Sequence, residues 1–176
     1  MKSFFTNVAD AINIARLNHF KSLNLTKKSD RVIEVGCGPV GFFTKYLEKN
    51  VKEVISVDAR QNLIEEHVKR HPHRRNKVGI ANLNEKDSLK KIGKFDLCFC
   101  YGLLYHLSNP AQAIENIAST SQMVVISTIC SPVDNGEVNF TKEDKDNDNQ
   151  SYDGDACRPA RDWIMKELKK HYQFVY

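Results

Sequence analysis

The sequence predicts an α/β protein of the doubly wound, Rossmann-like type, with a mostly parallel sheet of about six strands. Three observations lead to this prediction. Short apolar runs alternate along the chain with stretches whose apolar residues recur at helical spacing. The first apolar run ends in glycines spaced G-x-G-x-x-G, at Gly36, Gly38 and Gly41. The second run ends in an acid, Asp58, as strands that carry a nucleotide at their C-terminal ends often do.

Length and composition suit one domain over residues 1–176. The chain has 176 residues, and its formal charge of +4 (26 − 22) is too small to indicate nucleic acid by itself. No apolar run approaches the ~20 residues of a membrane span. The five cysteines have no CxxC spacing and predict neither a disulfide framework nor a metal site. We therefore expect a reducing, cytoplasmic location.

The elements of the first half follow from periodicity and from turn residues. An N-terminal helix is expected over 4–20, inside a helical cap of residues 1–25, because apolar residues mark one side of it. The glycine spacing then separates a strand from a helix, and Pro72 ends a later helix. The strands expected here cover residues 31–37, 53–58 and 77–83, and the helices after the cap cover 40–50 and 62–70.

The second half repeats the alternation. The run F-D-L-C-F-C-Y predicts a strand over 95–101, and Asn109-Pro110 is a helix start that predicts a helix over 110–120. A fifth strand is expected over 123–129, a helix over 158–171 and a short sixth strand over 173–176. The strand order is then 3-2-1-4-5-6, with no seventh, antiparallel strand. An open sheet edge invites pairing with another chain, so we expect a homodimer.

A polar stretch separates the fifth strand from the last helix. Between residues 131 and 155 it carries eight acids and two lysines, a net charge of −6 (2 − 8). A loop this long inside a compact domain is usually a functional lid or is disordered. We interpret residues 131–157 as an acidic lid loop.

The glycine turn predicts a ligand site at the edge of the sheet. Glycines there let the backbone approach a ligand closely, and the helix start offers free N–H groups. Glu34 lies two residues before Gly36, where a carboxylate would face the ligand. It would repel a pyrophosphate and attract an ammonium or sulfonium group, and S-adenosylmethionine (SAM) carries both of these cations.

Further polar residues follow the next strands. Asp58 is placed to accept hydrogen bonds from ribose hydroxyls, or alternatively to cap a helix, and Ala59 leaves room for an adenine ring. Asn82 is placed either to accept from the adenine amino group or to cap its own strand. The loop after the strand 95–101 faces the same point, because ligands bind beyond the carboxyl ends of parallel strands.

These residues resemble those of class I SAM-dependent methyltransferases. The resemblance rests on the run from Glu34 to Gly41, on Asp58 and on Y-G-L-L-Y-H-L-S-N-P at 101–110. It is closest to a small bacterial and phage-like subgroup with A-R-L-N-H-F at 15–20 and C-R-P-x-R-x-W at 157–163. It implies methyl transfer from SAM, with S-adenosylhomocysteine (SAH) as product. The cofactor-binding residues that it implies are Glu34, Gly36, Cys37, Gly38, Gly41, Asp58, Ala59, Asn82, Leu83, Cys100 and Tyr101.

The reacting end of the site is less well defined by the sequence. His106 is the first choice for a catalytic base, and a structural histidine is its alternative reading. Arg158 and Arg161 are alternatively solvated or paired with the acidic lid. The substrate-binding residues that we expect are His19, Tyr105, Arg158 and Arg161.

Three functions remain open at this stage. We favour methylation of a small-molecule or sugar-like acceptor. An RNA methyltransferase is the first alternative, because the basic run at 69–77 is either a phosphate contact or a solvated turn. The third function is a non-catalytic SAM-binding scaffold.

Overall fold

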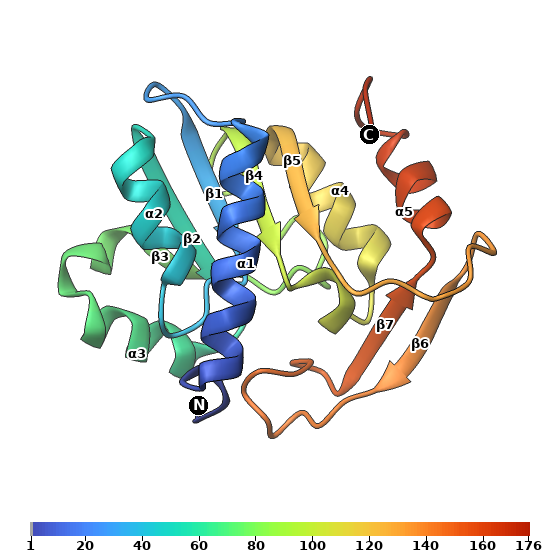
Figure 1. Cartoon of the computed structure of the whole chain (residues 1–176), viewed down its shortest axis with the longest axis horizontal. Helices are drawn as coiled ribbons and strands as arrows, with labels where there is room; N and C mark the ends of the chain where they lie inside the picture. Colours follow the sequence, from blue (N-terminus) through green and yellow to red (C-terminus); the bar gives the residue numbers. More distant parts are fainter. Residues whose placement is uncertain (1) are drawn as a thin grey trace.

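A five-stranded parallel sheet forms the centre of the protein, a computed structural model that describes residues 2–176 (Figure 1). Its strand order is β3-β2-β1-β4-β5, which confirms the predicted fold class and the order of the first five strands. Glu34 in β1 pairs with Ser56 in β2 and with Phe99 in β4, so the chain reverses its direction of winding beside β1. The strands are β1 (Arg31–Val35), β2 (Glu53–Asp58), β3 (Val78–Ile80), β4 (Phe95–Tyr101) and β5 (Ser121–Ser127).

Helices α1 and α4 begin at residues whose side chains cap them. The Thr6 hydroxyl accepts the backbone N–H of Ala9, and the Asn109 side chain accepts that of Gln112 just ahead of Pro110. Short 3-10 turns cover Lys2–Phe4, Pro72–Lys77 and Leu104–His106. The α-helices are α1 (Asn7–Leu23), α2 (Phe42–Asn50), α3 (Gln61–Arg70), α4 (Pro110–Thr120) and α5 (Arg161–Leu168).

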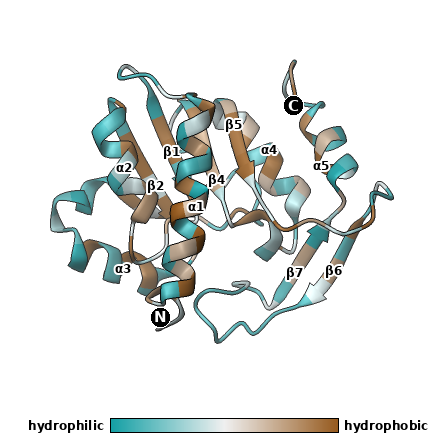
Figure 2. Cartoon of the chain, viewed as in Figure 1, coloured by the Kyte–Doolittle hydropathy of each residue, from teal (hydrophilic) through white to brown (hydrophobic). Residues whose placement is uncertain are grey.

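The two faces of the sheet have separate apolar cores. On one face, Phe20 of α1 and Leu47 of α2 pack on Val32 and Phe99 of the strands. On the other face, α4 and α5 cover residues of β1 and β4 such as Ile33. In Figure 2 the central strands are largely brown, whereas the helices around them mix brown and teal residues. Alternate strand residues thus serve opposite faces, as period-two packing requires.

Two sequence predictions about the second half are wrong. Residues 173–176 form no strand, since Phe174 and Tyr176 are exposed and have no neighbouring strand to pair with. The segment 131–157 is not an irregular loop throughout. It contributes β6 (Val138–Lys142) and most of β7 (Asp155–Pro159) to an antiparallel pair outside the main sheet. The expected homodimer can therefore no longer be argued from a terminal strand and stays a prediction.

No helix in residues 2–176 is long and apolar enough to cross a membrane.

Candidate functional site

A cavity of about 250 Å³ opens where β1, β2 and β4 end. Its walls come from the turn after β1, the end of β2, the loop after β4, helix α1 and the segment 131–157. The predicted residues that line it are Gly36, Cys37, Gly38, Asp58, Ala59, Asn82, Leu83, Tyr101, Tyr105 and His106. The carboxyl edge of the sheet therefore gathers residues from across the sequence, as expected for an open parallel sheet.

The glycine turn has a left-handed backbone that faces the cavity. Gly36 has φ +76°, and a Cβ placed on it would lie 3.2 Å from the Leu103 side chain. The N–H groups of Gly36 and Cys37 both donate to the carbonyl of Val57, at 2.8 and 3.1 Å. These bonds fix the turn against the end of β2. A side chain at Gly36 would be strained in its backbone and crowded by Leu103.

Asp58 joins the glycine turn to the end of β2. One carboxylate oxygen accepts the N–H of Gly38 and the other accepts the N–H of Arg60, each at 3.1 Å. Burial raises the pKa of Asp58 above its usual value, although these hydrogen bonds oppose the shift. Each oxygen keeps a further lone pair, so the carboxylate can also accept from a ligand in the cavity.

Glu34 does not face the cavity, which corrects the sequence prediction. It is 2% exposed, and one carboxylate oxygen accepts the hydroxyls of Thr44 (2.5 Å) and Ser56 (2.9 Å). Burial raises its pKa to about 7. Glu34 points to the same face of the sheet as Val32, and helix α2 covers that face. Its carboxylate therefore lies beneath α2.

Three other predicted residues also lie off the cavity. The Cys100 side chain is buried in the core, and Gly41 starts α2 with its Cα turned toward Arg74. His19 is outside the lining as well, but its Nδ1 lies 2.9 Å from the hydroxyl of Tyr101. Asn82 lines the cavity, yet its side-chain oxygen already accepts the N–H of Asn84. That contact is the strand-capping alternative.

His106 and Glu143 form a polar pair at the end of β4. His106 Nδ1 lies 2.5 Å from a carboxylate oxygen of Glu143, whose side chain is 8% exposed. The carboxylate also accepts the N–H of Ser151 at 2.8 Å and Arg158 Nη2 at 3.2 Å. Burial alone would raise the pKa of Glu143, but these donors outweigh it and lower that pKa. Burial lowers the pKa of His106, so its ring is neutral near pH 7.

The charge on Glu143 also decides the tautomer of His106. An ionised carboxylate can only accept hydrogen bonds, so Nδ1 carries the proton and donates it. Nε2 of His106 is then an acceptor, and no residue within 2–176 donates to it. Glu143 lies inside the segment 131–157, so this segment holds the ring. No local pattern distinguishes this acid from the other seven between residues 131 and 155.

The two predicted arginine contacts lie outside the cavity. Arg158 donates to the Tyr105 carbonyl (3.1 Å) and to Glu143, so it supports the wall behind the His106 pair. Arg161 is 72% exposed and pairs with Asp134. Both therefore match the alternative reading, in which they pair with the acidic segment.

Several lining residues were missed by the sequence reasoning. Arg60 donates to the carbonyls of Lys145 (3.0 Å) and Ser151 (2.9 Å), which ties the segment 131–157 to the end of β2. Arg16 of α1 is half-buried, lies against Gly102 and has no hydrogen bond or ion pair to any described residue. Its guanidinium is thus available to an anionic group. Only tertiary packing brings α1 to this wall, and no local pattern indicates it.

Comparison with known proteins identifies the fold and its family. A family model described as a methyltransferase domain matches residues 10–175. The chain belongs to this methyltransferase domain family. The ubiquinone biosynthesis O-methyltransferase of Coxiella burnetii is 28% identical over 108 residues, which are 61% of this chain and 45% of that protein. The chain thus matches less than half the length of that relative.

Solved structures support the same assignment of fold. The N-terminal domain of EvdMO1 with SAH bound has a TM-score of 0.72 at 17% identity, covering 90% of this chain and 70% of that one. A SAM-dependent methyltransferase from Mesorhizobium loti has a TM-score of 0.57 at 14% identity, covering 81% and 73%. The chain therefore has a methyltransferase domain with a matching fold, and SAM, the methyl donor that the sequence resemblance implies, is the cofactor to compare with its cavity.

The cavity of the methyltransferase domain fits this cofactor. Asp58 presents carboxylate oxygens at the end of β2, where the ribose of a bound nucleoside lies in such folds. Arg16, which has no ion pair within residues 2–176, can meet the cofactor's carboxylate, and the backbone beside Gly36 and Gly38 leaves room for a chain to pass. Within residues 2–176 no group of three or more His, Cys, Asp or Glu side chains could hold a metal ion.

Proposed function

We propose that the domain transfers the methyl group of SAM to a hydroxyl oxygen of a small-molecule, phenol- or sugar-like acceptor. The observation that carries this proposal is the His106–Glu143 pair beside the end of β4. A hydroxyl is a poor nucleophile until its proton leaves, so a neutral histidine with a free Nε2 suits it. The name O-methyltransferase, carried by the 28% identical relative, points the same way.

The proposal assigns a separate role to each group of residues at the cavity. SAM supplies a methyl group on a sulfonium that is already activated for in-line displacement. Asp58 and Arg16 hold the two ends of the cofactor, while Nε2 of His106 accepts the acceptor's proton. Glu143 then stabilises the imidazolium that forms, because its carboxylate already receives the Nδ1 proton. Arg60 and Arg158 anchor the segment 131–157 over the cavity and so help to exclude water.

The structure removes one candidate phosphate contact from the RNA alternative. Arg74, within the basic run at 69–77, is 2% exposed and pairs with Glu48, so it cannot meet a phosphate. The run is neither a simple solvated turn nor a continuous basic surface. We therefore do not favour nucleic acid as the acceptor.

A screen of acceptors tests the proposed function. Catechols, simple phenols and free or nucleotide-linked sugars would be incubated with SAM, with SAH release and product mass as readouts. We expect one hydroxyl class to be methylated, and Glu143→Gln to move the acid limb of the pH profile of kcat/KM to lower pH. The sign follows because the Glu143 carboxylate raises the pKa of His106, and its removal lets that pKa fall. Methylation of amines or thiols alone, with no hydroxyl product, would contradict the proposal.

A further inference from the structure

The underside of the glycine turn is supported by two histidines. His67 of α3 donates from Nδ1 to the carbonyl of Gly38, at 2.9 Å. His71, which caps α3, donates from Nε2 to the carbonyl of Val40, also at 2.9 Å. Neither histidine lines the cavity, so neither can touch the cofactor. They fix the backbone carbonyls of the loop from the side opposite the ligand.

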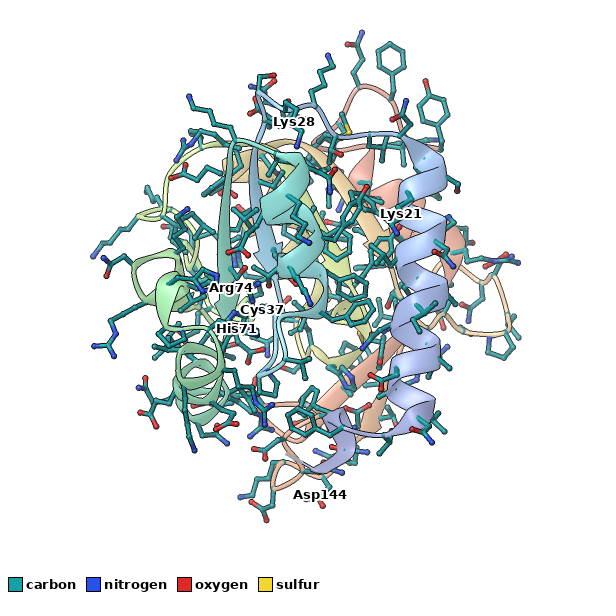
Figure 3. The ribbon with its side chains drawn as sticks, turned by 60° about the vertical axis from the view of Figure 1, so that its left-hand side comes forward. Lys21, Lys28, Cys37, His71, Arg74 and Asp144 are labelled. Atoms are coloured by element: carbon teal, nitrogen blue, oxygen red, sulfur yellow. The ribbon has the colours of Figure 1, made fainter. Side chains whose placement is uncertain are left out.

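Arg74 holds His67 in place. Its Nε and Nη2 donate to the two carboxylate oxygens of Glu48 on α2, at 2.9 and 2.8 Å. Its Nη1 lies 3.3 Å from Nε2 of His67. His67 is fully buried and Arg74 is 2% exposed. In Figure 3 the labelled side chains of His71 and Arg74 lie beside Cys37 at the glycine turn.

Gly41 closes this arrangement at the start of α2. A Cβ placed on it would lie 2.4 Å from Arg74 Nη1 and 2.6 Å from His67 Cε1, and its φ is +59°. Glycine is thus required there by the cluster behind the loop as well as by the backbone. The third glycine of the motif leaves room for His67 and Arg74 and does not contact the ligand cavity.

The contacts of His67 fix its charge. A guanidinium can only donate, so Nε2 of His67 must accept and Nδ1 must carry the proton. A second proton on the ring would place an N–H against an N–H of Arg74, with two positive charges in contact. Burial lowers the pKa of His67, and the charges of Arg74 and His71 lower it further, whereas the Gly38 hydrogen bond and Glu48 oppose the shift.

We infer that His67 is a positioning residue for the glycine turn at 36–41, where the cofactor binds. It acts only as a neutral imidazole, which Arg74 and Glu48 hold in place. Protonation pushes the ring away from Arg74 and releases the Gly38 carbonyl, so the loop loses the shape that binds SAM or SAH. The inference needs only the cofactor site. It stands whether or not the acceptor proves to be a hydroxyl.

Other charged groups also surround this cluster and define the controls. His73 lies 3.8 Å from Glu48, and Glu34 of β1 interacts with Arg74 from the sheet side. His71 faces His67 along α3, with ring centroids 5.4 Å apart. All of them lie close enough to His67, Arg74 or Glu48 to influence this cluster electrostatically. The effect of His67 must therefore be measured as a difference between matched variants.

The test is SAH binding by calorimetry from pH 8 to pH 5.5. In the wild type we expect the Kd to rise by up to about tenfold per pH unit below the pKa of His67. His67→Asn keeps a donor near the Nδ1 position and cannot become charged, so its Kd should stay nearly flat. His71→Gln, the matched control, removes the other histidine and should keep the wild-type pH dependence. His67→Leu should bind weakly at every pH.

A second readout needs no variant, in case these do not fold. Nitrogen-detected NMR of the wild type should show His67 as the Nδ1–H tautomer. Since protonation and binding are linked, saturating SAH should lower the pKa of His67 further. A wild-type Kd that is flat with pH, an equal pH slope in His67→Asn, or a His67 pKa unmoved by SAH would each overturn the inference.

Discussion

The same cavity is closed by two regions that differ in how they are built. The glycine turn, with the ends of β1 and β2, is held by backbone hydrogen bonds within about 30 residues of sequence, such as Gly36 N–H to Val57 C=O. The segment 131–157 is held at the cavity by side-chain contacts between residues far apart in the sequence, such as Glu143 with His106. The first region shapes a cofactor site that many methyltransferases share. In the proposed function, the second holds the His106–Glu143 pair that acts on the acceptor.

This contrast predicts which property of the protein each substitution should change. A residue of the glycine turn should affect cofactor affinity whatever the acceptor is. A residue at the contact between the β4 loop and the segment 131–157 should affect turnover and leave cofactor affinity nearly unchanged. The variants below test this separation, in order of decreasing effect.

Replacing His106 should have the largest effect. His106→Ala removes the proton acceptor, and we expect kcat to fall by about 10²–10³-fold, within the usual range for a general base. SAH affinity should stay within about twofold, because His106 is placed to contact the acceptor rather than the cofactor. Steady-state kinetics and calorimetry on the same preparation measure both. A parallel loss of SAH affinity would contradict the claim that the two regions act on different steps.

Glu34 should matter for stability and not for the ligand. Burial raises its pKa in the folded protein to about 7, above the ordinary value of 4.5, so the wild type loses stability as pH rises from about 4.5 through 7. Glu34→Gln removes this loss and should narrow the difference in unfolding free energy between pH 5 and pH 8 by up to about 3 kcal/mol. Urea unfolding at both pH values measures it.

The same variant also tests the orientation of Glu34. SAH affinity should change by less than about threefold, ~0.7 kcal/mol, because the carboxylate binds Thr44 and Ser56. A loss of SAH affinity of tenfold or more would instead indicate that the Glu34 carboxylate contacts the cofactor. Thr44→Val is the matched control, since it removes a partner of Glu34 from helix α2.

These two regions also differ in how well the sequence predicts them. Turn glycines and an acid after an apolar strand are local features, so the positions of Gly36, Gly38 and Asp58 at the cavity could be predicted. The direction in which Glu34 points could not be predicted. It lies on the face of β1 that α2 covers, and only the packed structure shows that α2 covers this face. The partner of His106 is 37 residues away, and it is one of eight acids in the segment between residues 131 and 155. The β6–β7 pair and the burial of Arg74 are likewise tertiary outcomes.

Replacing Asp58 should give the clearest loss of cofactor affinity. Asp58→Ala removes both the acceptor for a bound ribose and the contact with the Gly38 N–H, so we expect SAH affinity to fall at least tenfold, ~1.4 kcal/mol. Turnover at saturating SAM should fall much less than in His106→Ala. Calorimetry with SAH, with Asp58→Asn as an isosteric control, separates loss of charge from loss of shape. Unchanged binding would remove Asp58 from the site.

The smallest effect is expected at Arg161, on the outer side of the segment 131–157. Its guanidinium pairs with Asp134 in solvent, and Asp134 holds a lowered pKa mainly through this hydrogen bond. Exposed pairs contribute little, because water and salt screen them and ordering long side chains costs entropy. Arg161→Ala should therefore leave kcat/KM within about twofold and the thermal midpoint nearly unchanged. Arg158→Ala, the matched substitution three residues earlier, should lower kcat because it frees Glu143 from one of its donors. If Arg161→Ala were the more damaging of the two, the acceptor would have to reach beyond the cavity, and the segment would bind substrate on its outer side.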